Sequence, residues 1–219
     1  MKSIKNLNIN KGILNIICLT TLIPLTGCNK QMIDFNKNFN VAIETNGNAV
    51  SVVGIKNYSD YTGDSVQFIT LDNLVVLSST MQTELLNVSN DNSLNNYALA
   101  LSGNKEENVV NYNELQNITM NYDGSIWNKD VIDLHYTFNK AIILSDSNAT
   151  IVDIDTWTDY EEDDKIQIRL MDGTCVLTNI DRIKLVNDEN ANENSLTNYA
   201  VSLVGSNDNV IYYQNTNTK

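Results

Sequence analysis

The residues best suited to chemistry are five carboxylates crowded into one short turn. They are Asp159, Glu161, Glu162, Asp163 and Asp164. Calcium prefers carboxylate oxygens, but a dedicated calcium loop spaces them at alternate positions around a central glycine, and this turn has neither feature. The related turn at 60–64 keeps only two acidic residues. A solvated turn between two strands is the favoured interpretation, and calcium binding is the alternative.

Aromatic side chains flank these turns and could form a binding face. Tyr61 and Tyr160 occupy equivalent positions, and Trp157 precedes Tyr160 by three residues. Tyrosine and tryptophan often dominate the binding energy of surfaces that take a partner. The same side chains could instead cover the end of a hydrophobic core. We favour the core, and a sugar or peptide site at Tyr61, Trp157 and Tyr160 is the alternative.

The sequence offers no catalytic constellation. His135 is the single histidine, and no Gly-x-Ser-x-Gly or similar motif supplies a nucleophile for it. Cys175 lies in a strand-like run with no second cysteine or histidine nearby, so we expect it to be buried and inert. Neighbouring carboxylates on one turn cannot hold a substrate between them as a glycosidase pair does. We therefore expect a protein that is not an enzyme and that has no cofactor, with calcium as the alternative stated above.

The N-terminus carries the features of a bacterial lipoprotein signal. Three lysines precede an apolar run at 13–25, which is too short to span a bilayer and is typical of a signal peptide. The run ends in Leu25-Thr26-Gly27-Cys28, which resembles a lipobox. That resemblance implies cleavage before Cys28 and acylation of this cysteine, with palmitate among the acyl chains. We expect a signal peptide at 1–27 and a mature protein anchored on the extracytoplasmic face of the cell membrane; an ordinary secretory signal is the alternative.

The charge of the chain narrows the choice of partner. It has 27 acidic and 14 basic residues, and its net charge is −13. Because 1–27 holds three lysines and no acidic residue, its removal would leave 192 residues with a net charge of −16. Such a surface repels nucleic acid phosphates and anionic lipid heads. We therefore expect no nucleic acid partner, and contact with the membrane only through the lipid anchor at Cys28.

The sequence contains two copies of one repeat unit. A shift of 99 to 102 residues aligns Phe39-Asn40 with Phe138-Asn139, Asp60-Tyr61 with Asp159-Tyr160, Asp72 with Asp172, Val76-Leu77 with Val176-Leu177, and Ser93–Ala98 with Ser195–Ala200. So many matches in register indicate an internal duplication. We expect β repeat 1 at 28–115, a linker at 116–127 and β repeat 2 at 128–219.

Each repeat is predicted to be β structure. The segment 165–171 alternates strictly between apolar and polar residues, as a half-buried strand does, and Asp172-Gly173 then favours a two-residue hairpin turn. Further strands are expected at 136–143, 150–157, 174–178, 183–186, 97–102, 199–204, 109–112 and 210–213. No helical period exceeds two turns. The predicted fold class is all-β, with two tandem homologous small barrel or sandwich domains whose edge strands are protected by negative charge.

Repeat 2 resembles a small uncharacterised β domain of prophages and mobile elements in low-GC Gram-positive bacteria. The resemblance is carried by the segments 136–143, 157–164 and 166–168, and it implies no activity or site residue. We therefore expect a non-enzymatic lipoprotein that binds a surface, cell-wall or phage protein. One alternative is a prophage or mobile-element exclusion lipoprotein, by analogy of layout alone. A divalent-cation-binding surface module is the other.

Overall fold

A computed structural model describes residues 39–62, 64–122, 137–160 and 164–213, and it is mostly β structure. Repeat 1 contains β1 (Val41–Asn46), β2 (Ala49–Thr62), β3 (Ser65–Thr70), β4 (Val75–Ser79), β5 (Thr83–Leu86), α2 (Asp91–Leu101), β6 (Val109–Asn111) and α3 (Tyr112–Leu115). Repeat 2 contains β7 (Lys140–Leu144), β8 (Ala149–Tyr160), β9 (Lys165–Leu170), β10 (Cys175–Asn179), β11 (Ile183–Asn187), α4 (Ser195–Val204) and β12 (Val210–Tyr212). The all-β class expected from the sequence is therefore confirmed in broad terms, with short helices added.

The two repeats share one strand order. It is β4-β3-β2-β1-β5 in repeat 1 and β10-β9-β8-β7-β11 in repeat 2. In each repeat the last short strand lies parallel to the long second strand, β6 against β2 and β12 against β8. The long strands β2 and β8 each carry an irregularity midway, after Ile55 and Ile154, where they exchange one antiparallel neighbour for another. Irregularities of this kind bend a strand, so each repeat curls around its own apolar face.

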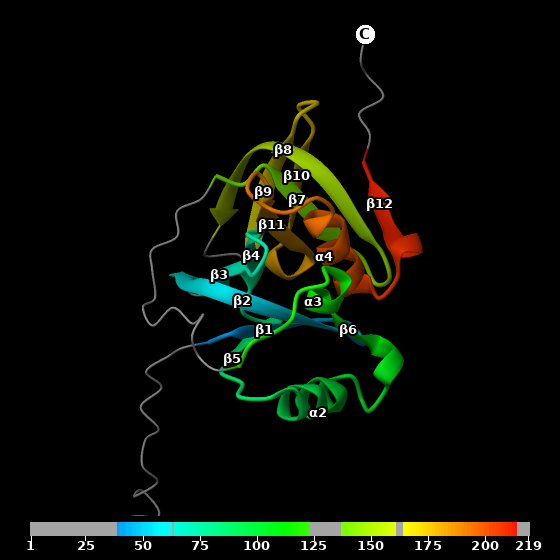
Figure 1. Ribbon diagram of the computed structural model, residues 1–219. Coiled ribbons are helices and arrows are strands. Elements are labelled where there is room, and N and C mark those ends of the chain that lie inside the picture. The colour runs from blue at the N-terminus through cyan, green and yellow to red at the C-terminus, as the bar shows by residue number, and fades with distance from the viewer. Residues whose placement is uncertain (1–38, 63, 123–136, 161–163, 214–219) are drawn as a thin grey trace, which may run out of the picture. The chain divides into compact units, whose positions relative to one another are not determined.

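The repeats are joined edge to edge. Strand β11 pairs antiparallel with β4, with Leu185 opposite Leu77, so a single sheet crosses both repeats. The strand path is open, and its end strands are β10 and β5 (Figure 1). The described chain forms one compact unit.

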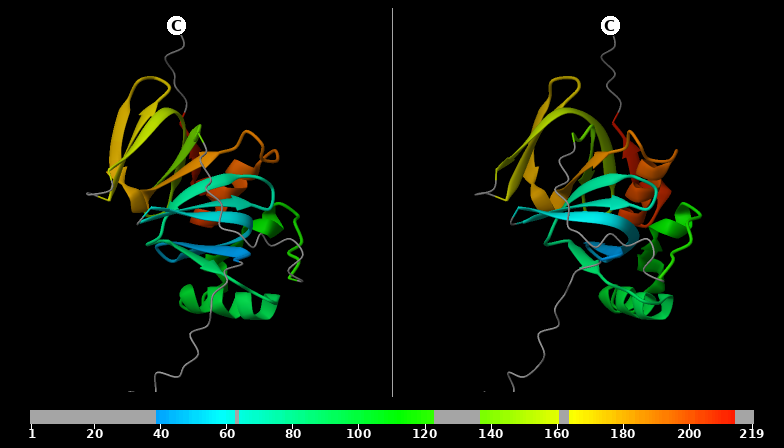
Figure 2. Two further views of the ribbon diagram at one scale, coloured as in Figure 1. Left: turned by 90° about the vertical axis from the view of Figure 1, so that its left-hand side faces the viewer. Right: turned by 60° about the vertical axis from the view of Figure 1, so that its left-hand side comes forward.

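The largest hydrophobic core belongs to both repeats. Helix α4 lies between the strands of repeat 1 and those of repeat 2 (Figures 1 and 2), and it contacts both β2 and β8. The core includes Ala42, Val53, Phe68 and Val76 from repeat 1, and Ile142, Ile151, Val186, Tyr199 and Leu203 from repeat 2. Part of the stabilisation from burial is therefore shared, since this core draws its side chains from both repeats.

Two predicted strands are helices. The segments expected as strands at 97–102 and 199–204 lie in α2 and α4. Leu94, Ala98 and Leu101 are spaced four and three residues apart, which is a helical period that the alternation of shorter windows obscures. Asn90 also caps α2 by accepting a hydrogen bond from the backbone amide of Ser93 at 2.9 Å. Among the described residues, no helix has the length and apolar character needed to cross a membrane.

The hairpin expected at Asp172-Gly173 forms between β9 and β10, but its loop has three residues, 171–173, rather than two, because Leu170 pairs with Thr174. Gly173 takes a positive φ of 87° in this loop. The expectation that Cys175 is buried is wrong. It is a free cysteine exposed on β10, because this strand lies at an end of the sheet and, among the described strands, pairs only with β9. A strand-like sequence does not reveal whether its strand is central or at an edge.

Candidate functional site

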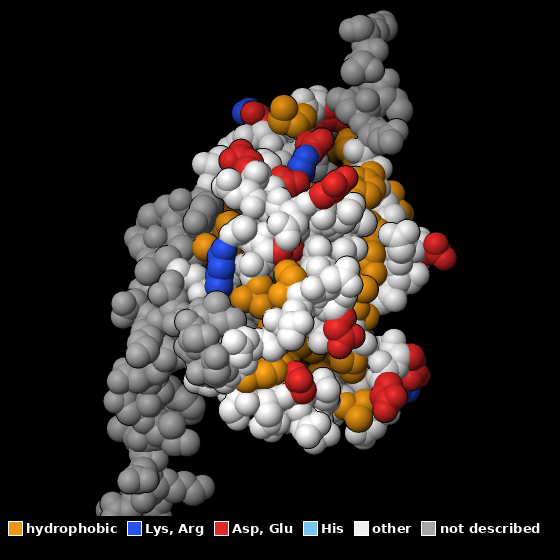
Figure 3. All heavy atoms as spheres, in the orientation of Figure 1, with side chains coloured by type: hydrophobic (Ala, Val, Ile, Leu, Met, Phe, Trp, Pro, Cys, Tyr) orange, Lys and Arg blue, Asp and Glu red, His pale blue; other side chains and the backbone are white. Residues whose placement is uncertain are grey.

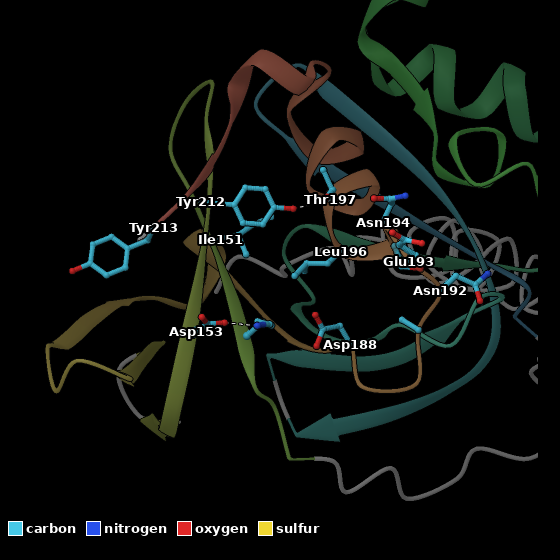
Figure 4. A pocket seen from close by; sticks show the side chains of 13 residues that line it. Ile151, Asp153, Asp188, Asn192, Glu193, Asn194, Leu196, Thr197, Tyr212 and Tyr213 are labelled. Atoms are coloured by element: carbon cyan, nitrogen blue, oxygen red, sulfur yellow. Dashed lines mark hydrogen bonds and ion pairs between the residues drawn. The ribbon is translucent and has the colours of Figure 1, made fainter. Parts of the chain in front are cut away.

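The described surface contains a cleft of about 440 Å³ in repeat 2, between α4, β8, β12 and the loop that precedes α4 (Figure 4). Strand β12 runs parallel to β8 and places Tyr212 opposite Ile151. The Tyr212 hydroxyl forms a hydrogen bond with Thr197 of α4, which ties the strand to the helix. Ile151 and Leu196 give the cleft an apolar floor between polar walls.

The polar walls carry more acidic than basic groups. Lys140 forms an ion pair with Asp153, while Asp188 and Glu193 also line the cleft. Desolvation alone would lower the pKa of Lys140, but the hydrogen bond to Asp153 and the nearby negative charges raise this pKa overall. Figure 3 shows the same excess of acidic side chains over the visible face. The cleft is therefore suited to a ligand that combines an apolar group with a positive charge.

The equivalent place in repeat 1 is filled by the linker. Met120 and Tyr122 pack there against the core of β1, β2 and α2. A Cβ atom on Gly54 would lie 2.3 Å from the Met120 sulfur, and Gly54 is the counterpart of Asp153 in the cleft. Tyr122 bonds to Asp91, the counterpart of Glu193, and burial together with this bond raises the pKa of Tyr122. A short segment of polypeptide outside any helix or strand thus occupies in repeat 1 the position that is a cleft in repeat 2.

The walls of the cleft and of the equivalent place in repeat 1 differ in charge. Val41, Gly54 and Val88 of repeat 1 are replaced by Lys140, Asp153 and Asp188 in repeat 2. In contrast, the apolar pairs Val52/Ile151 and Leu94/Leu196 keep their character. The apolar floor is therefore retained in both repeats. The charged walls of the cleft in repeat 2 suit a charged segment, whereas the uncharged walls in repeat 1 suit an apolar one.

A buried ionic network joins the repeats but has no access to solvent. Lys184 of β11 forms an ion pair with Glu44 of β1 at 3.1 Å, and both side chains are at most 1% exposed. The Glu44 carboxylate also accepts hydrogen bonds from Tyr199 at 2.5 Å and Ser78 at 3.0 Å. Burial, followed by the neighbouring Glu44, raises the pKa of Tyr199 well above its usual range. A ligand cannot reach this network, so we assign it to the packing of the repeats and not to a binding site.

A second buried cluster surrounds Asp72 in the turn between β3 and β4. Its carboxylate accepts hydrogen bonds from Tyr112 and Ser195, each at 2.6 Å. Burial and the charge of Asp72 raise the pKa of Tyr112. Repeat 2 keeps the first of these contacts, because the Tyr213 hydroxyl donates to Asp172 at 2.8 Å.

The structure describes only part of the acidic turn, so the cation site predicted there is not tested. Glu161, Glu162 and Asp163 lie outside the described residues, while Asp164 is exposed with a positive φ of 50° and Asp159 is partly buried. Within the described ranges, no group of three or more His, Cys, Asp or Glu side chains is placed to hold a metal ion.

The predicted aromatic face is described only at Trp157. Its ring is half-buried, packs against the core of repeat 2, and makes an edge contact with Phe138 at 5.6 Å. The side chains of Tyr61 and Tyr160, as well as Cys28 and His135, lie outside the described residues. Sequence reasoning did not identify the cleft, because its lining comes from four segments that only the fold brings together. A comparison of Val41, Gly54 and Val88 with their charged counterparts in repeat 2 was the signal that could have pointed to it.

We expect calcium to leave the melting temperature unchanged, because the acidic turn does not have the ligand spacing of a calcium loop. A concentration of about 1 mM suffices, since it would half-saturate a weak extracellular site. The measurement is thermal unfolding with calcium and with an equal concentration of magnesium, which controls for charge screening. A rise specific to calcium that is lost in an Asp159→Asn/Asp164→Asn variant would instead establish a cation site.

In comparisons with known proteins, no protein-family model, curated protein or solved structure matches this chain.

Proposed function

We propose that the chain is a non-enzymatic binding protein of the bacterial cell surface, made of two tandem homologous β repeats and held at the membrane by acyl chains on Cys28. Its binding site is the cleft of repeat 2. The observation that supports this function is the linker of repeat 1, whose Met120 and Tyr122 fill the equivalent place. The chain's own segment thus indicates the class of ligand, which is a short piece of polypeptide.

The charges of the cleft indicate which polypeptide would bind. Ile151 and Leu196 offer the same apolar floor that Met120 and Tyr122 use in repeat 1. Asp188 and Glu193 add negative charge that Lys140 does not neutralise, since it is already paired with Asp153. The partner is therefore a protein of the cell surface, cell wall or an incoming phage that presents a short segment with a lysine or arginine.

The test uses a synthetic peptide of linker residues 117–122, Asn-Ile-Thr-Met-Asn-Tyr. Versions with lysine or glutamate in place of the methionine probe the charge preference. Binding is followed through the NMR signals of the Ile151 and Leu196 methyl groups. We expect the lysine peptide to bind about two- to fivefold more tightly than the glutamate peptide, as is typical of partly exposed charge pairs.

The control variants separate the cleft from the general negative charge. Asp188→Asn should remove most of the preference for the lysine peptide, whereas Asp146→Asn removes an exposed acidic residue outside the cleft and should leave the preference intact. If no peptide shifts the Ile151 and Leu196 signals at millimolar concentration, the cleft does not bind polypeptide and the proposal fails. If the chain's own residues 214–219 occupied the cleft instead, their deletion would itself shift the Ile151 and Leu196 signals and would allow the peptides to bind more tightly.

A further inference from the structure

The two end strands of the sheet are counterparts of the two strands that join the repeats. Strand β10 corresponds to β4, and β5 corresponds to β11. Since β4 pairs with β11 inside the chain, β10 and β5 are the two halves of the same junction, each left without its partner in the described chain (Figure 1). Unpaired edge strands present rows of backbone donors and acceptors that can pair with another chain.

The apolar side chains around this junction show the same relation. Residues buried between the repeats have counterparts that are exposed on β10, on α2 or directly after β12. The pairs are Leu77 and Leu177 (2% and 59% exposed), Tyr112 and Tyr213 (0% and 46%), Tyr199 and Tyr97 (0% and 40%), and Leu203 and Leu101 (1% and 38%). These four counterparts are among the nine large hydrophobic residues exposed on the described chain. A fifth, Met171, lies next to Asp172 in the turn before β10.

One face of α2 repeats the face by which α4 docks on repeat 1. In α4 this face consists of Ser195, Tyr199, Ser202 and Leu203, all at most 1% exposed. Their counterparts in α2 are Ser93, Tyr97, Ala100 and Leu101, all exposed. Each helix packs against its own repeat in the same manner, so α2 presents to solvent the surface that α4 buries.

One of the two hydrogen bonds made by Asp72 at the internal junction is also present at its counterpart, Asp172. Asp72 accepts from Tyr112 of its own repeat and from Ser195 of the other repeat. Asp172 keeps the bond from Tyr213, and Ser93, the counterpart of Ser195, is exposed on α2. Bringing Ser93 of a second chain to Asp172 would complete the same arrangement.

We propose that the chain associates head to tail with a second copy of itself, with β10 of one chain pairing antiparallel with β5 of the next. The contact continues the β4–β11 junction, so it is heterologous and can add further copies in the same direction. The register follows from the internal junction, in which Leu185 lies opposite Leu77 and Asn187 lies opposite Val75. A shift of 100 residues places Leu85 opposite Leu177 and Asn87 opposite Cys175.

The contact between chains lacks the ionic network of the internal junction. The counterparts of Glu44 and Lys184 are Ile143 and Glu84, and the Glu84 carboxylate accepts a hydrogen bond from Tyr97 of its own repeat. Two chains of net charge −13 also repel each other. Association is therefore reversible and weaker than the packing of the repeats, and salt should strengthen it by screening the repulsion.

Disulfide trapping tests the register directly. One full-length chain carries Asn87→Cys with Cys175→Ser, and a second, with a different affinity tag, keeps Cys175; Cys18 and Cys28 are serine in both. Directly opposite residues of an antiparallel pair bring their Cβ atoms about 4.5–5.5 Å apart, so a small movement at the edge of the sheet brings them to the roughly 3.5–4.5 Å of a disulfide. Mild oxidation of the mixture should give a heterodimer with a yield several-fold above that of a control in which Ser145→Cys replaces Asn87→Cys.

A second variant, Leu177→Asp, tests whether the crosslink depends on the proposed interface. Leu177→Asp changes an exposed side chain, so it should not alter the melting temperature, but it should reduce the heterodimer to the level of the Ser145→Cys control. Higher salt should raise the yield of the matched pair. The proposal is overturned if the matched pair and the Ser145→Cys control give equal yields, or if Leu177→Asp leaves the yield unchanged.

Discussion

A Lys184→Met variant is expected to lose about 3–5 kcal/mol of unfolding free energy, because the substitution leaves the Glu44 carboxylate buried without its ion-pair partner. Lys184 also donates hydrogen bonds to Ser78 at 2.5 Å and to Gln82 at 3.1 Å, and these are lost as well. The measurement is equilibrium unfolding in urea. A loss of this size would be a large fraction of the stability of an ordinary domain.

Two further variants locate the cause of this loss. Lys140→Met removes a lysine from the partly exposed pair with Asp153 and should cost about 1 kcal/mol or less. A Glu44→Gln/Lys184→Met double variant removes both buried charges and should be more stable than Lys184→Met alone. A Lys184→Met variant as stable as Lys140→Met would show that the buried pair contributes little to the fold.

The position of this ion pair separates the internal junction from the contact between chains. Glu44 of β1 and Lys184 of β11 meet beside Ser78 of β4, within the internal junction, whereas their counterparts are Ile143 of β7 and Glu84 of the end strand β5. A buried carboxylate without a cation is costly, so β4 of repeat 1 should pair with β11, which carries Lys184, rather than with β5 of another chain, which carries Glu84 at this position. The network thereby distinguishes the junction between repeats from the contact between chains.

Local patterns predicted the strands well because alternation and turn chemistry are local properties. The alternating residues of β9 and the Asp172-Gly173 turn are examples, and the matching strand orders agree with two related repeats. The helices were missed at Leu94, Ala98 and Leu101, where the period extends over more than one turn. In repeat 2, Leu196, Tyr199, Ala200 and Leu203 carry the same signal more clearly.

Contacts between distant segments could not be predicted from these patterns. Lys184 looks like an exposed residue of an alternating strand, and nothing local indicates that Glu44, 140 residues earlier, neutralises it. The exposure of Cys175 depends on which strand ends the sheet, and the cleft depends on where the linker runs. The duplication contained part of this information, because differences between the repeats occur at the junction and the cleft.

A Tyr199→Ala variant is expected to lose about 3–5 kcal/mol of unfolding free energy, as large aromatic-to-alanine changes in a core do. Its ring is fully buried between the repeats, contacts Tyr112 edge to face at 5.9 Å, and its hydroxyl donates to Glu44. The matched control is Tyr97→Ala, which removes the exposed counterpart on α2 and should change the stability by about 0.5 kcal/mol or less.

The form of the unfolding curve then distinguishes a shared core from two independent domains. Because the core around Tyr199 draws side chains from both repeats, wild type and Tyr199→Ala should each unfold in one transition followed equally by fluorescence and circular dichroism. With the chain's other tryptophan, Trp127, replaced by phenylalanine, the fluorescence of Trp157 reports on repeat 2, and far-ultraviolet circular dichroism reports on the strands of both repeats. If the Trp157 signal moved to lower temperature while half of the strand signal stayed in place, the repeats would fold separately, and the β4–β11 pairing would contribute little to their cooperativity. A common shift of both signals is the result that the buried position of Tyr199 between the repeats requires.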